Sequence, residues 1–148
     1  MDLGRGKMDD EYVNMTPVEE ELKMIVYTSG TTGKRVIAFY TQKDIDLWED
    51  CCARAIMAAG GTDEDVCQVC YGYGLFTGGM GVHHGSRKLR ATVIPISSGN
   101  TQKQLMLMKD FHTNLFTCTP SYAMYMAEQA KQAGIDLHAL TLKEACIG

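Results

Sequence analysis

The sequence has 148 residues, 45% of them hydrophobic and 22% charged, which is the size and composition of about one packed domain and excludes a disordered or fibrous chain. The formal charge is −4, and residues 1–21 hold seven acids against two cations. The remaining residues hold twelve cations against eleven acids without a basic stripe, so we expect neither nucleic acid nor an anionic membrane surface as a partner.

Residues 1–21 are polar, acidic and without periodicity, which predicts a lead-in arm ahead of a domain over residues 22–148. The first ten residues lack the apolar stretch of a secretory signal, so we expect a cytoplasmic protein. The longest run without Asp, Glu, Lys or Arg, residues 66–86, contains six glycines and two histidines. It is therefore not a membrane helix.

Two β-prone runs, Met24–Tyr27 and Val36–Tyr40, predict strands on either side of a loop of small residues. Thr41 and Asp44 then form a capping-box pattern, which predicts a helix that stops at Gly60-Gly61. The apolar positions expected to face the core are Ile45, Trp48, Cys52, Ala55 and Ala59, with Asp46, Asp50 and Arg54 on the opposite face.

The rest of the chain alternates short apolar runs with helix-like segments, which predicts parallel strands joined by right-handed crossovers. The fold class is thus α/β, with parallel strand–helix units preceded by a β-hairpin. Strands are expected at Val66–Tyr71, Ala91–Ile96 and Asn114–Cys118, and Ala145–Gly148 resembles the start of another. Helices are expected at Gly79–Leu89, from Thr101 (capping-box partner Gln104) to about Asp110, and from Pro120 to about Ala133.

Cysteine and histidine patterns favour packing over metal binding. The six cysteines, at positions 51, 52, 67, 70, 118 and 146, lie mostly in apolar runs, which indicates buried thiols. Cys67 and Cys70 would face opposite sides of one strand, so we expect no zinc site. His83 and His84 diverge by about 100° on a helix and cannot bind one metal from the same face.

The loop Thr28–Lys34 consists of hydroxyl side chains, glycines and one lysine. Its unobstructed N–H groups, hydroxyls and ammonium suit an anion such as a phosphate chain, although a flexible hairpin turn is the alternative. It is not a Walker A loop, because Thr28 and Arg35 stand where that motif requires Gly and Ser or Thr, and a strand follows instead of a helix.

The run Tyr-Thr-Ser-Gly-Thr-Thr-Gly-Lys at residues 27–34 resembles the phosphate-binding signature of adenylate-forming enzymes. Further matches at Tyr71–Gly79, His83, Val93–Ser97 and Thr119–Tyr122 resemble the phenylacetate–coenzyme A ligase family, over about residues 17–148. The resemblance implies an acid–thiol ligase that uses ATP and Mg²⁺ to activate phenylacetate or a related aryl acid to an acyl-adenylate. Coenzyme A, as co-substrate, then gives the thioester.

The same resemblance assigns residues to two sites. The phosphate contacts would be Ser29, Gly30, Thr31, Thr32, Gly33 and Lys34, and the wall of the aryl-acid site would include Tyr71, Phe76 and Gly78. Arg35 departs from the family, which usually has proline there.

The family's adenine-binding segment, its acidic magnesium-associated motif and its C-terminal domain with the catalytic lysine would all lie beyond Gly148. We therefore expect a partial N-terminal domain, inactive by itself, whose protein partner is the missing remainder of the ligase or a second copy in a homodimer.

Two alternatives remain open on the residues. The turn Gly72–Gly78 has features of the dinucleotide-binding unit of an NADP-type oxidoreductase, although it is one residue too long and no acid closes the next strand. A non-catalytic nucleotide- or acid-binding module would also suit a chain of this length.

Overall fold

The structure, a computed structural model, describes residues 22–27, 37–74 and 77–147. The expected lead-in arm, phosphate loop and Phe76 lie outside these residues. Strands β1 (Met24–Tyr27) and β2 (Ile37–Tyr40) pair antiparallel, which confirms the hairpin.

Helix α1 (Gln42–Ala58) begins with the predicted capping box. The backbone N–H of Thr41 donates to Oδ2 of Asp44 at 2.9 Å, and the N–H of Asp44 donates to Oγ1 of Thr41 at 3.3 Å. These two bonds satisfy N–H groups that have no partner within the helix, so they fix where α1 starts.

The buried face of α1 differs from the predicted one in its second half. Ala53 and Ile56 are buried there, whereas Ala55 and Ala59 are exposed. The prediction was wrong because it followed helical spacing alone, while the buried face is set by the helix that packs against α1.

Four parallel strands form the main sheet in the order β4-β3-β5-β6, which confirms the α/β class. The strands are β3 (Val66–Val69), β4 (Thr92–Ile94), β5 (Leu115–Cys118) and β6 (Glu144–Ile147). The helices between them are α2 (Thr77–Lys88), α3 (Thr101–Asp110) and α4 (Pro120–Gln132), and a short 3-10 helix, η1 (Leu137–Ala139), follows α4.

Some element boundaries differ from the predictions. Strand β3 ends at Val69, two residues early, because the chain bends at Tyr71 and leaves the sheet. The N-cap of α3 is Asn100 and not Thr101: its side chain accepts from the N–H of Lys103, and its φ of 46° is one that asparagine tolerates. The predicted capping-box role of Gln104 was therefore wrong.

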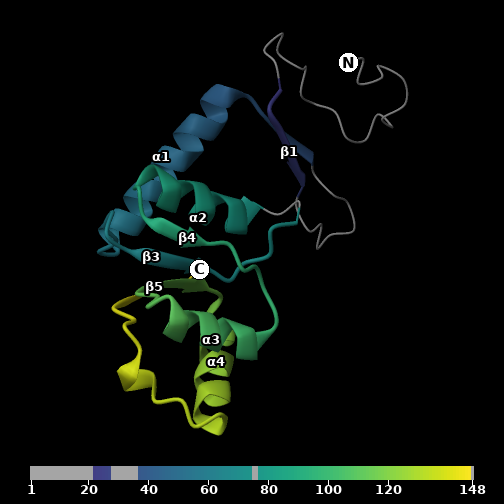
Figure 1. Ribbon diagram of the computed structural model, residues 1–148. Coiled ribbons are helices and arrows are strands. Elements are labelled where there is room, and N and C mark those ends of the chain that lie inside the picture. The colour runs from purple at the N-terminus through teal and green to yellow at the C-terminus, as the bar shows by residue number, and fades with distance from the viewer. Residues whose placement is uncertain (1–21, 28–36, 75–76, 148) are drawn as a thin grey trace.

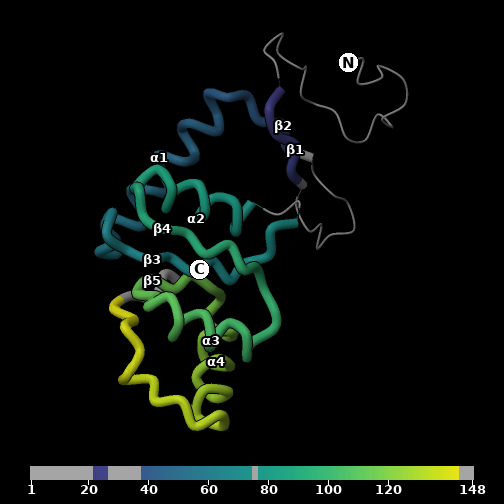
Figure 2. Tube along the Cα trace, viewed as in Figure 1, coloured from purple at the N-terminus to yellow at the C-terminus, as the bar shows by residue number. Residues whose placement is uncertain are grey.

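The sheet is covered on both faces. Helices α1 and α2 lie on one side of it and α3 and α4 on the other, as both the ribbon (Figure 1) and the Cα trace (Figure 2) show. Cys67 belongs to the core cluster on the α1/α2 face, and Cys70 to the cluster on the α3/α4 face. The expected opposite orientation of these two thiols is confirmed.

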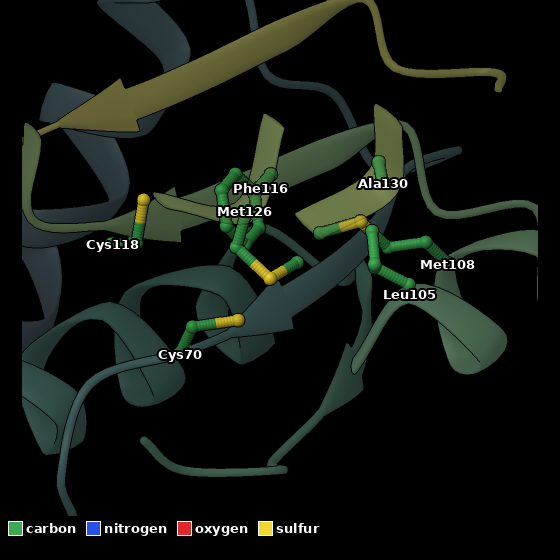
Figure 3. Packing of buried hydrophobic residues seen from close by; sticks show 7 residues of the cluster. All are labelled: Cys70, Leu105, Met108, Phe116, Cys118, Met126 and Ala130. Carbon is green, nitrogen blue, oxygen red and sulfur yellow. The ribbon is translucent and has the colours of Figure 1, made fainter. Parts of the chain in front are cut away.

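The α3/α4 face holds the larger apolar cluster (Figure 3). Leu105, Met108 and Ala130 gather at one end of it, Cys70 and Cys118 lie toward the other, and Phe116 and Met126 lie between them. Its buried members are Cys70, Leu105, Met108, Phe116, Cys118, Met126 and Ala130.

On the opposite face, α2 approaches α1 through glycines. A Cβ on Gly85 would lie 2.6 Å from Cβ of Cys52 and 2.8 Å from its backbone carbon, and one on Gly81 would lie 2.8 Å from the ring of Trp48. Real Cβ atoms do not come this close, so the glycines allow the two helices to touch along their backbones.

At the amino end of β3, the buried carboxylate of Asp65 joins distant segments. Its Oδ2 accepts from the N–H of Thr62 at 2.7 Å, and Nζ of Lys143 lies 2.6 Å from Oδ1. Burial raises the pKa of this carboxyl, but Lys143 and Thr62 outweigh that effect and hold the pKa below its usual value.

In the described part of the chain, no helix is long and apolar enough to cross a membrane.

Candidate functional site

The candidate site follows from the order of the strands. The chain passes from β3 through α2 to β4 on one side, then returns through α3 to β5 on the other side of β3. Such a reversal is a topological switch point, and ligands of open parallel sheets bind beyond the carboxyl ends of the two strands that flank it. The residues after β3 and β5 therefore form the candidate site, called the switch point below.

Tyr71 links the two strand ends at the switch point. Its hydroxyl donates to the carbonyl oxygen of Cys118 at 2.5 Å, and its half-buried ring packs against the core cluster of the α1/α2 face. Because the hydroxyl is engaged with the scaffold, Tyr71 can offer a ligand an aromatic surface held in a fixed orientation.

The turn after Tyr71 folds tightly against the start of α2. A Cβ on Gly79 would lie 2.6 Å from the carbonyl oxygen of Gly72, so only glycine fits at position 79. Gly78, partly buried, lies in the first turn of α2. Among the nine site residues predicted from the sequence, only Tyr71 and Gly78 are within the described residues; Ser29–Lys34 and Phe76 are not.

The two adjacent histidines have different partners. Nδ1 of His83 lies 3.1 Å from the hydroxyl of Tyr73, and Nδ1 of His84 lies 3.0 Å from Oε1 of Glu49 on α1. Burial, and after it the electrostatic effects of His84 and Arg87, lowers the pKa of His83. The expected divergence of the two rings is confirmed, and the lowered pKa favours the neutral form of His83 beside the turn.

The thiols near the switch point are unreactive. Burial raises the pKa of Cys70 to about 12 and that of Cys118 to about 11, so neither is a thiolate at neutral pH. Cys51, in contrast to the expectation of buried thiols, is exposed. No group of three or more His, Cys, Asp or Glu side chains that could hold a metal ion occurs in the residues that the structure describes.

Sequence reasoning missed a buried polar network under the site. Gln68 of β3 donates from Nε2 to Oε1 of Gln104 at 2.8 Å, and its own Oε1 accepts from the hydroxyl of Thr113 at 3.0 Å. All three side chains are fully buried. The available signal was a glutamine inside the apolar run Val-Cys-Gln-Val of a central strand, where a polar group requires partners.

The fold matches that of adenylate-forming CoA ligases. A solved structure of 2-hydroxyisobutyryl-CoA ligase, in complex with 2-HIB-AMP and CoA, aligns with a TM-score of 0.81 and 25% identity, covering 86% of this chain and 28% of that one. A fatty acyl CoA synthetase from Mycobacterium tuberculosis aligns with a TM-score of 0.57 at 13% identity, covering 75% of this chain and 21% of that one. No family model matches the chain.

Within that class, the relatives by sequence are phenylacetate-coenzyme A ligases. The enzyme from Pseudomonas putida is 44% identical over 147 residues, which cover 98% of this chain and 34% of that protein. The Escherichia coli K12 enzyme is 45% identical over 130 residues, which cover 87% of this chain and 30% of that protein. The chain is thus homologous to part of phenylacetate-coenzyme A ligase and spans about a third of the length of these curated relatives, which confirms the resemblance. The oxidoreductase alternative is not favoured.

Proposed function

We propose that this chain supplies the acid-binding and phosphate-binding part of an ATP-dependent ligase that joins phenylacetate, or a related aryl acid, to coenzyme A. The homology to four phenylacetate-coenzyme A ligases at 41–45% identity carries the proposal. In this reaction a carboxylate oxygen attacks the α-phosphorus of ATP and pyrophosphate leaves. The thiol of coenzyme A then attacks the acyl carbon, and AMP leaves as the thioester forms.

The switch point suits the acid. The ring of Tyr71 is fixed by its hydrogen bond to Cys118, and the neighbouring thiols are neutral, so the surroundings fit a flat apolar ring better than a charged one. We assign Tyr71, Phe76 and Gly78 to the wall of this site. The loop Ser29–Lys34 would hold the phosphates.

Magnesium would enter with the nucleotide, bound to its phosphates. The family's acidic magnesium-associated motif would lie in the remainder of the ligase, and no cluster of three potential metal-binding side chains occurs in the described residues. Residues 22–148 would form part of the ligase's N-terminal domain behind an acidic arm, with the remainder of the ligase as protein partner and a cytoplasmic location.

A chimera tests the proposal directly. This chain would replace the aligned 147-residue segment of the Pseudomonas putida enzyme, and phenylacetate-dependent ATP–pyrophosphate exchange and thioester formation would be measured. We expect both activities in the chimera and neither in the 148-residue chain alone. A folded chimera without exchange for any aryl acid would instead support a non-catalytic binding module, and strong exchange by the chain alone would contradict the need for the remainder.

A double variant of the chimera separates the two sites. Thr31→Ala with Lys34→Ala should raise the KM for ATP and slow exchange, while phenylacetate affinity stays close to that of the parent chimera, because these groups would face phosphates. Unchanged ATP kinetics with weakened acid binding would show that the loop has been assigned to the wrong ligand.

A further inference from the structure

The loop between β4 and α3 is held by a side chain from inside the protein. Nε2 of Gln104, which is fully buried, donates to the carbonyl oxygen of Ser97 at 2.8 Å and to that of Gly99 at 3.2 Å. One amide group on α3, the helix that follows the loop, therefore makes two hydrogen bonds to the loop backbone.

This loop has an unusual backbone that needs such support. Ser97, Gly99 and Asn100 have φ values of 70°, 89° and 46°, all in the left-handed region that non-glycine residues avoid. The N–H of Ser97 also donates to the carbonyl oxygen of Val69 at 3.1 Å, at the end of β3. The loop is thus fixed both to the sheet and to α3.

The orientation of the Gln104 amide is determined by its other neighbours. Its Oε1 accepts from Nε2 of Gln68 at 2.8 Å and from the thiol of Cys70 at 2.7 Å. Since two donors face this oxygen, the Nε2 end must face the loop. The network of Gln68 and Thr113 therefore aims the two donors of Gln104 at the carbonyl oxygens.

The loop also borders the switch point. Oγ of Ser98 lies 3.7 Å from the place that a Cβ on Gly72 would take, so the loop adjoins the turn that follows Tyr71. On its other side, the hydroxyl of Tyr122 lies 3.4 Å from the carbonyl oxygen of Gly99 and 3.2 Å from Oγ1 of Thr101. Tyr122 belongs to α4, the helix that starts directly after β5.

We propose that Gln104 is a positioning residue for acid recognition, which holds the 97–100 loop against the turn at the switch point so that the loop limits the space open to the acid. This inference rests on the proposed function. Gln104 itself is buried and touches no substrate. The Gln104 amide affects the acid only by holding the carbonyl groups of Ser97 and Gly99 in place. Removing this amide should therefore change acid binding more than nucleotide binding.

The test uses the active chimera with Gln104→Leu, which keeps the side chain's bulk and removes both donors. We expect the KM for phenylacetate to rise about tenfold, because small misplacements of positioning groups have large kinetic effects. The KM for ATP should stay within about twofold of the parent value. Tyr122→Phe removes a single hydroxyl, is expected to fold, and should raise the phenylacetate KM in the same direction by a smaller factor.

Met108→Ala is the matched control, since Met108 is buried on the same helix and in the same core cluster as the residues around Gln104. It should lower stability and leave the phenylacetate KM unchanged.

The inference is overturned if folded Gln104→Leu keeps the parent KM for phenylacetate, if the KM values for phenylacetate and ATP rise equally, or if Met108→Ala gives the same acid defect. Should Gln104→Leu not fold, an unchanged phenylacetate KM in Tyr122→Phe overturns it. An inactive parent chimera would count against the proposed function instead.

Discussion

The two faces of the parallel sheet are packed by different kinds of contact. On the α1/α2 face, glycines bring one helix against the backbone of the other, and any added atom would collide. On the α3/α4 face, an apolar cluster adjoins a hydrogen-bonded group of Gln68, Gln104 and Thr113, to which Cys70 of the cluster donates. The first arrangement depends on the absence of side chains, and the second depends on every polar group having a partner. Different substitutions should therefore destabilise the two faces.

Gly85→Ala should have the largest effect, a loss of about 2–3 kcal/mol in the free energy of unfolding. The new Cβ would meet the backbone of Cys52, which cannot move aside. Gly81→Ala should cost less, because it meets the ring of Trp48, a side chain that can shift. Denaturant titration of the chain measures both.

Gly74→Ala is the control for this pair, because nothing lies within 4 Å of an added Cβ there. It should change stability by no more than about 0.5 kcal/mol. Equal losses at positions 74, 81 and 85 would show that close approach of the helices does not stabilise this face.

Gln68→Leu tests the opposite face, where a loss of about 1–3 kcal/mol is expected because Thr113 and Gln104 lose a buried partner. Adding Thr113→Val should cost less than the sum of the single changes, since it removes a group left unsatisfied. Gln102→Leu, exposed on α3, is the control. Strict additivity in thermal or denaturant unfolding would contradict the network.

The smallest expected effect is a pH dependence that belongs to the α1/α2 face. Because the folded-state pKa of His83 is lowered, its neutral form is favoured by folding, so stability is intact above the unfolded pKa of about 6.5 and falls as pH drops through the folded value. The neighbouring titratable and charged groups are His84 and Arg87 on α2, with Glu49 of α1 paired to His84.

His83→Gln should flatten the decline of the melting temperature between about pH 7 and pH 5, the range below the ordinary histidine pKa. His138→Gln, at an exposed position, provides the comparison. Cys70 on the α3/α4 face should contribute nothing in this range, because burial raises its pKa to about 12. If the melting temperature of His83→Gln falls with pH as steeply as that of the parent, the titrating group is not His83.

Local signals in the sequence predicted most of the elements. The capping box at Thr41, proline at the start of α4 and the alternation of apolar runs each reflect interactions within a few residues, and these were confirmed. Tyr71 could be placed near a strand end for the same reason, although β3 ends two residues before it. Its hydrogen bond to Cys118, 47 residues away, has no local signature.

The wrong predictions for Gln104 and Ala55 share a physical cause, because contacts between distant segments determine how these residues are placed. Gln104 follows Thr101 at capping-box spacing, yet its side chain turns to the core because Gln68 and the loop carbonyls offer buried partners. Ala55 has the spacing of a core position but is exposed, since the glycines of α2 fix which side of α1 is covered. Neither result can be obtained from one segment alone.

The ion pair between Asp65 and Lys143 has a consequence for how the chain folds. These residues are 78 positions apart, so this contact, together with the parallel pairing of β6 on β5, raises the contact order and favours slow folding. On the ribosome, Asp65 emerges long before its cation does. Until then β3 can pair with β4, but the carboxylate at its amino end must stay hydrated, so this end of the sheet closes only after β3 and β4 have been synthesised and can pair.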